Sequence, residues 1–260
     1  MRTPEQKRNY TQQLFSAIAP EYDFICRVLS FRRDAAWKRA LVAALPPRHG
    51  IVCLDLACGT GDLTFLLADR YPGACIVGLD FAESMLALAR RRNERSNVCF
   101  VRQDMGALGF GAESVDIITG GYALRNAPDL GVAVREIRRV LKPGGVAAFL
   151  DLSRPSRRVP DIVQRGLLRI WGDFWGWLLH RNPDAYGYLA KSLGQFPDRV
   201  RLRGLFRENG FEIVASRRHF LGLMEMLMVR KLAPSDRAGH LREALQRPGE
   251  DGGHQTEGQQ

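Results

Sequence analysis

The stretch IVCLDLACGTGDLTFLLADRY (residues 51–71) decides the fold of this chain. Its first seven residues form an apolar run of the kind found in a strand buried on both faces of a sheet. Residues 62–71 then have the apolar spacing of a helix. Between the two lie Gly59 and Gly61, which let the backbone approach a ligand without a Cβ in the way. A strand, a glycine-rich turn and a helix in this order predict the first unit of a parallel α/β sheet.

The same alternation continues along the chain. Apolar runs predict further strands at residues 75–80, 97–104, 115–121, 146–152, 211–218 and 220–231. Helical spacing predicts intervening helices at residues 84–94 and 132–141. Because crossovers between parallel strands are right-handed, we expect an α/β protein with a doubly wound, mostly parallel, Rossmann-like seven-stranded sheet.

Two segments stand outside this alternation. Residues 1–48 predict helices that precede the sheet, and residues 155–210 interrupt it after the fifth strand as an inserted helical cap. We expect residues 1–233 to form one domain. Residues 234–260 are rich in Gly, Gln and Pro and poor in apolar side chains, so we expect a disordered tail.

Composition places the chain among ordinary globular proteins. Its 260 residues are 45% hydrophobic and 25% charged, which excludes a disordered, collagen-like or disulfide-stapled chain. A net charge of +10 suits a nucleic acid, an anionic membrane surface or an anionic ligand, and charge alone does not choose among them. The five cysteines form no Cys-x-x-Cys pair, so we expect no metal site. Four of the five lie in or beside apolar runs, which favours buried, reduced thiols, and the polar start MRTPEQKRNY does not resemble a signal peptide, so we expect a cytoplasmic protein.

Acidic residues close three successive predicted strands: Asp55, Asp80 and Asp104. Ligands of open α/β sheets bind beyond the carboxyl ends of the strands, where an acid can accept hydrogen bonds from ribose hydroxyls. A tight turn with a capping acid is the alternative, and three such acids in succession argue against it. The turn lacks the third glycine of a dinucleotide fingerprint, and Asp62 would repel a pyrophosphate. A cofactor with a cationic end, such as S-adenosylmethionine, fits better.

Several motifs resemble those of known enzymes. LDLACGTGDLT (54–64), ESML (83–86) and VLKPGG (140–145) resemble class I S-adenosylmethionine-dependent methyltransferases. Three further segments resemble, more specifically, the UbiE-type quinone C-methyltransferases: IAPEYDFICRVLSFRRDAAWKR (18–39), ALRNAPD (123–129) and PDAYGYLAKSLGQFPD (183–198). The resemblance implies S-adenosylmethionine as cofactor. It also implies methylation of a ring carbon of a prenylated hydroquinone in menaquinone or ubiquinone biosynthesis, of the demethylmenaquinol or 2-methoxy-6-polyprenyl-benzoquinol type.

The resemblance also assigns cofactor contacts residue by residue. They fall beside the glycine-rich turn, and the whole expected set is Asp55, Gly59, Thr60, Gly61, Asp80, Asp104, Met105 and Gly120. Asp104 and Gly120 replace residues that are commonly Asn and Ser in the family. Since Asp104 can still accept from an adenine amino group and Gly120 still offers its backbone, we expect cofactor binding to survive both changes.

Methyl transfer to a ring carbon requires a phenolic proton to leave. A phenol with a pKa near 10 lies about 3 units above neutral pH, so ionising it costs about 4 kcal/mol. A guanidinium beside the phenolate offsets part of this cost. The resemblance implies Arg125 in that role, with Asn126 and Tyr186 as orienting partners and Asp104 as a base acting through a water. The expected acceptor pocket is lined by Tyr22, Tyr122 and Tyr186.

Simpler roles remain open for these residues. Arg125 can instead pair with an acid and fix its loop, and the tyrosines can pack inside the protein. Residues 161–180 have a helical pattern with three tryptophans, and 153–182 hold six arginines against two aspartates. That combination is typical of a segment that lies on a membrane surface. A helix packed on the sheet or a homodimer interface is the alternative for this segment.

Three other functions stay open. One is a methyltransferase for another aromatic or polyketide acceptor in secondary metabolism, because FLGLMEMLMVRKLA (220–233) departs from the usual glycine-rich end of the family. The second is an RNA-binding module or RNA methyltransferase, suggested by the charge. The chain carries no recognised RNA-binding motif, so we expect no nucleic-acid partner. The third is a binding protein without catalysis, against which Gly59, Gly61 and Asp80 argue.

Overall fold

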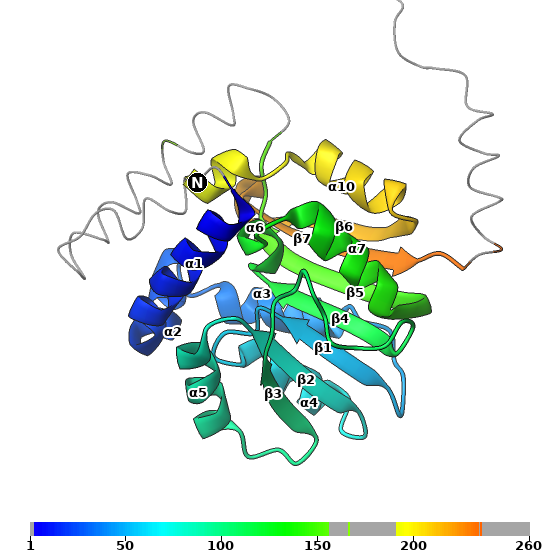
Figure 1. Ribbon diagram of the computed structural model, residues 1–260, viewed down its shortest axis with the longest axis horizontal. Helices are drawn as coiled ribbons and strands as arrows, with labels where there is room; N and C mark the ends of the chain where they lie inside the picture. The colour runs from blue at the N-terminus through cyan, green and yellow to red at the C-terminus, as the bar shows by residue number, and fades with distance from the viewer. Residues whose placement is uncertain (1–2, 156–165, 167–190, 234, 236–260) are drawn as a thin grey trace, which may run out of the picture.

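A seven-stranded sheet runs through the protein, which a computed structural model describes over residues 3–155 and 191–233 and at the single positions 166 and 235 (Figure 1). Its strands are β1 (Val52–Leu56), β2 (Cys75–Asp80), β3 (Val98–Arg102), β4 (Val115–Gly121), β5 (Leu141–Leu152), β6 (Phe211–His219) and β7 (Met224–Lys231). They lie in the order β3-β2-β1-β4-β5-β7-β6. The pairs among β1 to β5 are parallel, and β7 runs antiparallel to both β5 and β6. The predicted doubly wound, mostly parallel sheet is therefore confirmed.

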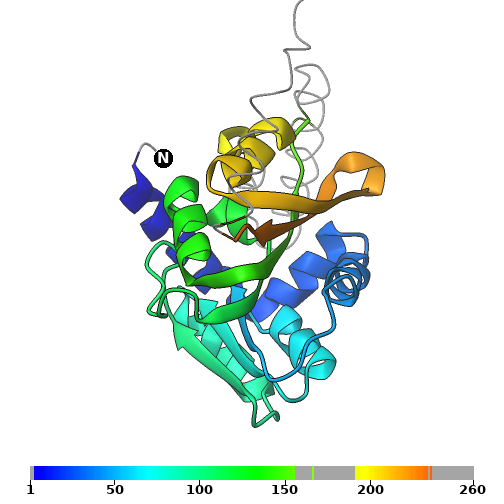
Figure 2. The same ribbon diagram turned by 90° about the vertical axis from the view of Figure 1, so that its right-hand side faces the viewer.

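Helices cover both faces of this sheet (Figures 1 and 2). One face carries α3 (Asp34–Ala43), α4 (Asp62–Arg70) and α5 (Glu83–Arg92), and the other carries α6 (Ala123–Asn126), α7 (Leu130–Val140) and α10 (Arg199–Glu208). The elements that precede α3 are α1 (Pro4–Ile18), the short 3-10 helix η1 (Ala19–Glu21) and α2 (Tyr22–Leu29). A second 3-10 helix, η2 (Phe220–Gly222), joins β6 to β7. The expected N-terminal helices are thus present.

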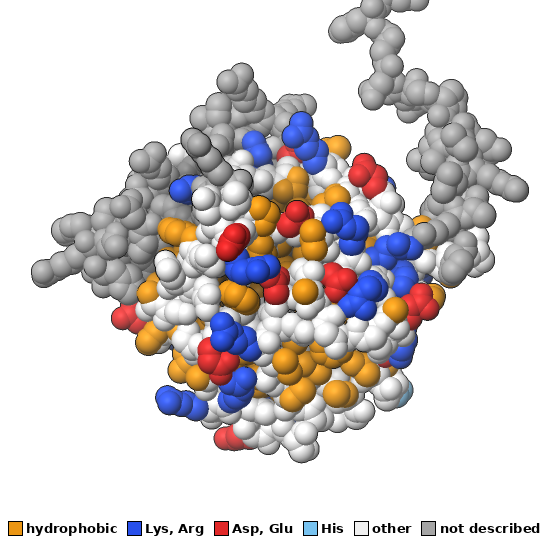
Figure 3. Space-filling model, in the orientation of Figure 1, with side chains coloured by type: hydrophobic (Ala, Val, Ile, Leu, Met, Phe, Trp, Pro, Cys, Tyr) orange, Lys and Arg blue, Asp and Glu red, His pale blue; other side chains and the backbone are white. Residues whose placement is uncertain are grey.

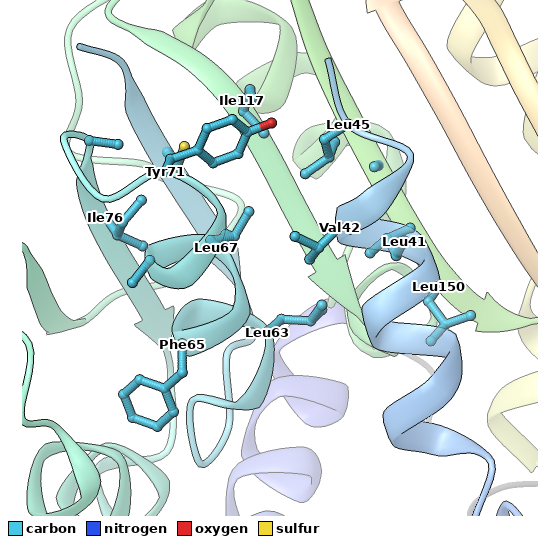
Figure 4. Close-up of a cluster of buried hydrophobic side chains, with 14 of the residues drawn as sticks. Leu41, Val42, Leu45, Leu63, Phe65, Leu67, Tyr71, Ile76, Ile117 and Leu150 are labelled. Carbon is cyan, nitrogen blue, oxygen red and sulfur yellow. The ribbon is translucent and has the colours of Figure 1, made fainter. Parts of the chain in front are cut away.

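The core on the α3–α4 face shows why these elements form (Figure 4). Leu41 on α3 and Leu67 on α4 are fully buried against Ile117 of β4. Strands covered on both faces need apolar residues on both faces, which explains why β1 and β4 are mostly apolar and almost entirely buried. The helices instead bury one stripe. In α7, for example, Val134 and Ile137 are buried, and the Asp129 side chain caps the first turn by accepting from the Val132 N–H at 2.9 Å.

The inserted segment after β5 is described only near its C-terminal end. Within the range 155–210, α10 packs on β6 and α7 and buries Leu202 and Phe206 against the sheet. This helix therefore covers the sheet as α7 does. The predicted interfacial stretch 161–180, apart from Gly166, and the predicted tail, apart from Ser235, lie outside the described residues, as does Tyr186. In the part of the chain that is described, no helix is both long and apolar enough to cross a bilayer.

One face of β2 and β3 carries no helix, because the connection from β3 to β4 forms none. Figure 3 shows apolar side chains gathered over these strands. Cys75 and Cys99 are exposed there, and Val101 is 40% exposed. The expectation that the cysteines are buried was therefore wrong for these two. An apolar run predicts a strand, but whether both of its faces are covered depends on the neighbouring connection.

Candidate active site

The turn between β1 and α4 has a backbone that glycine favours. Gly59 has a φ of +55° and Gly61 a φ of +92°, both in the left-handed region. A Cβ at Gly61 would lie 3.0 Å from the Phe65 ring and 3.1 Å from the Phe100 ring. A Cβ at Gly59 would lie 3.5 Å from the ring of Tyr22. The turn therefore needs its glycines, and Tyr22 of α2 lies over it.

Asp55 lies beneath this turn and has no exposed surface. Its two oxygens accept from the hydroxyls of Thr119, at 2.8 Å, and Thr64, at 2.7 Å. Burial raises the pKa of the carboxyl to about 6, although both hydroxyl hydrogen bonds act to lower it. Asp55 thus ties the turn to β4 and α4.

Asp80, at the end of β2, holds the turn from the side. One carboxylate oxygen accepts from the Gly59 N–H and the other from the Ala82 N–H, each at 2.8 Å. Burial raises the pKa of Asp80, and these backbone hydrogen bonds act in the opposite direction. Each oxygen retains a further acceptor site, so Asp80 can also bind the hydroxyls of a ligand.

A cleft of about 760 Å³, including its open mouth, lies at the carboxyl edge of the parallel strands. Its walls come from α1 and from the segments that follow β1, β2, β3 and β4. The predicted site residues that line it are Tyr22, Gly59, Asp80, Asp104, Met105, Tyr122 and Asn126.

The other predicted contacts do not line this cleft. Besides Asp55 and Gly61, these are Thr60, Gly120 and Arg125. The Thr60 hydroxyl donates to Asp23 of α2 at 2.6 Å. A Cβ at Gly120 would lie 2.8 Å from the Cβ of Ala123, so close packing explains this glycine, and it is the next residue, Gly121, that lines the cleft.

Arg125 lies behind the cleft wall and is only 4% exposed. Its Nε is 3.3 Å from an oxygen of Asp151, and one terminal nitrogen donates to the Ser192 hydroxyl at 2.5 Å. The Arg125 backbone N–H also donates to Asp151, at 3.0 Å. Burial raises the pKa of Asp151, while the Arg125 guanidinium acts to lower it. The arginine is therefore paired with Asp151 and hydrogen-bonded to Ser192.

Tyr122 connects the cleft to a buried set of charges. Its φ of +60° is uncommon for a bulky residue, and its hydroxyl donates to Asp34 at 2.6 Å. The Lys38 ammonium lies 2.6 Å from Asp34 and 3.1 Å from Asp62. Burial acts to lower the pKa of Lys38, but the two carboxylates outweigh it and the pKa is raised. Sequence reasoning missed this set, although the i,i+4 spacing of Asp34 and Lys38 on a helix was a signal for their ion pair.

Helix α1 covers the cleft through two basic residues that sequence reasoning also missed. The Arg8 guanidinium lies 2.6 Å from Asp104, whose other oxygen accepts from the Gly106 N–H at 2.8 Å. The Lys7 ammonium donates to the backbone carbonyls of Arg125, at 3.0 Å, and Ala127, at 2.5 Å. No local pattern in the sequence signals these contacts, because their partners lie about a hundred residues further along the chain.

The donor and acceptor groups of the cleft fit S-adenosylmethionine. Asp80 offers carboxylate oxygens to ribose hydroxyls, and Asp104 offers them to an adenine amino group or to a cation. Over the described residues, no group of three or more His, Cys, Asp or Glu side chains could hold a metal ion. The carboxylates of Asp80 and Asp104 suit an organic, partly cationic ligand.

Solved structures share this fold. An S-adenosylmethionine-dependent methyltransferase from Thermotoga maritima aligns with a TM-score of 0.61 at 18% identity, over 85% of this chain and 99% of that one. Another, from Mesorhizobium loti, aligns with a TM-score of 0.55 at 20% identity, over 76% of this chain and 98% of that one. The fold is thus the Rossmann-like fold of S-adenosylmethionine-dependent methyltransferases.

Sequence relatives give a narrower assignment. The model of the ubiE/COQ5 methyltransferase family matches residues 2–231. A demethylmenaquinone methyltransferase of Thermus thermophilus is 39% identical over 77% of this chain and 92% of its own. One of Lactococcus lactis subsp. lactis is 34% identical over 80% of this chain and 84% of its own. The chain belongs to the ubiE/COQ5 methyltransferase family, as its motifs predicted.

Proposed function

We propose that this protein uses S-adenosylmethionine to methylate a ring carbon of demethylmenaquinol, as a step of menaquinone biosynthesis. Relatives of 34% and 39% identity are named for this reaction. The observation that carries the proposal is the cleft itself. It joins the acids expected for the cofactor, Asp80 and Asp104, to Asn126 of the family motif and to the neighbouring Tyr122. No observation favours an acceptor from secondary metabolism.

The residues of the cleft divide between the two substrates. Bound cofactor would supply the methyl group, held by Asp80 at its ribose and by Asp104 and Met105 at its adenine. Tyr22 and Tyr122 would contact the acceptor ring, and their hydroxyls stay protonated at neutral pH because burial raises both pKa values. Both tyrosines therefore present neutral surfaces, which suit an aromatic ring.

The phenolic proton has to leave before or during transfer of the methyl group. Asp104 is the carboxylate in the cleft that could take it through a water, and Asn126 could orient the phenolate oxygen. The guanidinium of Arg125 is held by Asp151 and Ser192, so we assign Arg125 a positioning role for the short helix α6, which carries Asn126. The Asn126 side chain in turn donates to the Tyr122 carbonyl at 2.8 Å, which links the two residues at this wall.

The prenyl chain of such an acceptor resides in a bilayer. The protein would therefore act as a peripheral enzyme at the cytoplasmic face of a membrane. Residues 161–180, with their tryptophans and arginines, are the sequence segment that suits this contact.

The test is a methyl-transfer assay with labelled S-adenosylmethionine and reduced demethylmenaquinone in detergent. A 2-methoxy-6-polyprenyl-benzoquinol and an aromatic phenol without a prenyl chain serve as comparison acceptors. Mass spectrometry of the product should place the label on a ring carbon of the menaquinol. The Asp80→Asn variant keeps the side-chain shape but replaces one acceptor by a donor, so its cofactor affinity should fall by at least about tenfold.

Each outcome bears on a different part of the proposal. Labelling of the benzoquinol alone would show that the acceptor is a benzoquinol and not demethylmenaquinol, while the proposed type of reaction would stand. Tight cofactor binding with no labelled quinol would refute the acceptor class. Label on an oxygen would refute methylation at carbon. Unchanged cofactor affinity in Asp80→Asn would refute the assigned cofactor site.

A further inference from the structure

Two apolar side chains project from the carboxyl edge of the sheet, close to one another. Leu221, in the turn between β6 and β7, is fully exposed, and Phe31, in the loop between α2 and α3, is 52% exposed. Phe220 connects the two segments, because its ring centroid lies 5.4 Å from that of Phe31. Figure 2 shows the β6–β7 turn, in orange, projecting beyond the sheet on the side of α2 and α3, in blue.

The backbone holds these side chains outward at an energetic cost. Phe31, Arg32, Phe220 and Leu221 have φ values of +52°, +62°, +50° and +55°, a region that bulky residues rarely adopt. A turn selected only for its shape would place Gly or Asn at such positions. Leu221 contributes no buried contact to the fold that would offset the strain, since its side chain is fully exposed.

Arginines without acidic partners surround these side chains. Arg27, Arg32, Arg217 and Arg218 are exposed, and none forms an ion pair with another residue that the structure describes. Arg33 lies over the Phe220 ring at 5.9 Å.

The acids of the same elements are already paired. Asp23 pairs with Arg92, Asp34 with Lys38, and Glu225 with Arg203. Counting only the described residues, the region therefore carries an excess of positive charge around an apolar tip.

We propose that these side chains form a docking surface for an anionic phospholipid bilayer: Phe31 and Leu221 enter the interface, and Arg32, Arg217 and Arg218 contact the headgroups. Exposed apolar tips ringed by cations are what such an interface binds. A nucleic acid would use the arginines but leave the tips without a role, and a second copy of the same surface would be repelled by its charge. The choice of a bilayer rests on the proposed function, since a prenylated acceptor resides there.

The position of the docking surface suits the cleft. Leu152, at the end of β5, pairs with Met224 at the start of β7, so the β6–β7 turn lies at the same edge of the sheet as the cleft. Phe31 follows α2, whose first residue, Tyr22, lines the cleft. Docking through this surface therefore brings the carboxyl edge, with its cleft, towards the lipid.

The test is sedimentation of the full chain with vesicles made of equal parts of phosphatidylglycerol and phosphatidylcholine, and with vesicles of phosphatidylcholine alone. Leu221→Asn is the decisive variant, because Asn accepts a left-handed φ and the fold should be as stable as before or more so. Its affinity for the anionic vesicles should fall on the order of tenfold. Arg217→Gln with Arg218→Gln should lower it by about tenfold or more, since each arginine contributes about fivefold.

Matched controls lie on α10. Val200→Asn removes an exposed apolar side chain elsewhere, and Arg201→Gln with Arg207→Gln removes two exposed charges, so both should bind vesicles as the parent does. All variants should methylate a soluble acceptor without a prenyl chain at the parent rate, which keeps this test separate from that of the proposed function. Anionic binding that survives Leu221→Asn and the double arginine variant, or that falls equally in the controls, would overturn the proposal. So would a loss seen only in binding of nucleic acid.

Discussion

The carboxyl of Asp55 is buried without a direct cationic partner, and this burial raises its pKa. The pKa of about 6, against the usual 3.8, means that the folded protein keeps a proton where the unfolded chain has lost it. The stability contributed by this group is therefore greatest at low pH and falls as pH rises from about 4 to about 6. A shift of about two units corresponds to a cost of about 3 kcal/mol for the ionised carboxylate at neutral pH.

The variant Asp55→Asn isolates this cost, because it keeps the side-chain shape but carries no charge. In urea denaturation, the free energy of unfolding of Asp55→Asn minus that of wild type should be about 2.5 kcal/mol larger at pH 7 than at pH 4, because the variant lacks the charge whose burial destabilises wild type at neutral pH. Glu136→Gln is the control with the opposite sign, since hydrogen bonding to Arg139 lowers the pKa of Glu136. A difference for Asp55→Asn that does not vary with pH would contradict the assignment.

The pair Arg125 and Asp151 separates a positioning role from a direct one. Arg125→Met leaves the Asp151 carboxylate buried without its partner and should cost about 3–5 kcal/mol of stability. Arg125→Met combined with Asp151→Asn removes both charges and should recover most of that loss. If Arg125 only positions α6, the double variant should keep the parental pH profile of kcat and bind the acceptor more weakly. A kcat profile displaced to higher pH would show instead that the guanidinium stabilises the phenolate.

Helix α1 illustrates how an element acquires function through contacts distant in sequence. Lys7 donates to one carbonyl within α6 and to one just after it, and Arg8 pairs with Asp104. Together these contacts hold α1 over the cleft, where Thr11 and Phe15 form part of the wall. Loosening α1 should therefore affect ligand binding more than the fold of the sheet.

Replacing Lys7 by Met tests this role. The loss of two hydrogen bonds from a charged donor should destabilise the packing of α1 over the cleft by about 1.5–3 kcal/mol. Hydrogen exchange should then show faster exchange in α1, with α7 and the strands unchanged, and the KM for both substrates should rise. The Glu5→Gln variant on the same helix is the control. Uniformly faster exchange throughout the chain would mean that Lys7 supports the whole fold instead.

The elements that the sequence predicted well are those whose pattern depends on local burial. The apolar runs located β1, β2 and β4 to within one or two residues, because the interior residues of these strands are buried and mostly apolar. The third strand ends at Arg102, two residues before Asp104, because that acid instead begins the loop to β4. Cys75 and Cys99 are exposed because the connection from β3 to β4 forms no helix over this face of the sheet. The apolar runs of the strands themselves give no sign of that.

The site was predictable in part for the same physical reason. Parallel strands end at one edge, so an acid after β2 and another after β3 were expected to meet, and Asp80 and Asp104 do line one cleft. The partners of Arg125 and Tyr122 were not predictable. They are chosen by tertiary packing, through Asp151 for one and Asp34 for the other, at 26 and 88 residues' distance in sequence.

At the scale of the whole molecule, the carboxyl edge of the sheet holds both the cleft and the docking surface. A prenylated acceptor partitions into the bilayer, so an enzyme bound there meets it at a raised local concentration. The chain is basic, with a net charge of +10, so this encounter should depend on anionic lipid and on salt. A soluble acceptor does not partition into the bilayer, so binding of the enzyme to the membrane does not raise its local concentration.

Kinetics on vesicles test the arrangement. With demethylmenaquinol in vesicles that contain phosphatidylglycerol, KM should be lower than in vesicles of phosphatidylcholine alone, and kcat should be unchanged, because docking affects encounter and leaves the cleft as it is. Raising the salt concentration should abolish the difference as the charges are screened. With an acceptor that lacks the prenyl chain, neither lipid nor salt should alter kcat/KM. An equal effect of anionic lipid on both acceptors would mean that lipid acts on the cleft itself and not through the position of the enzyme on the membrane.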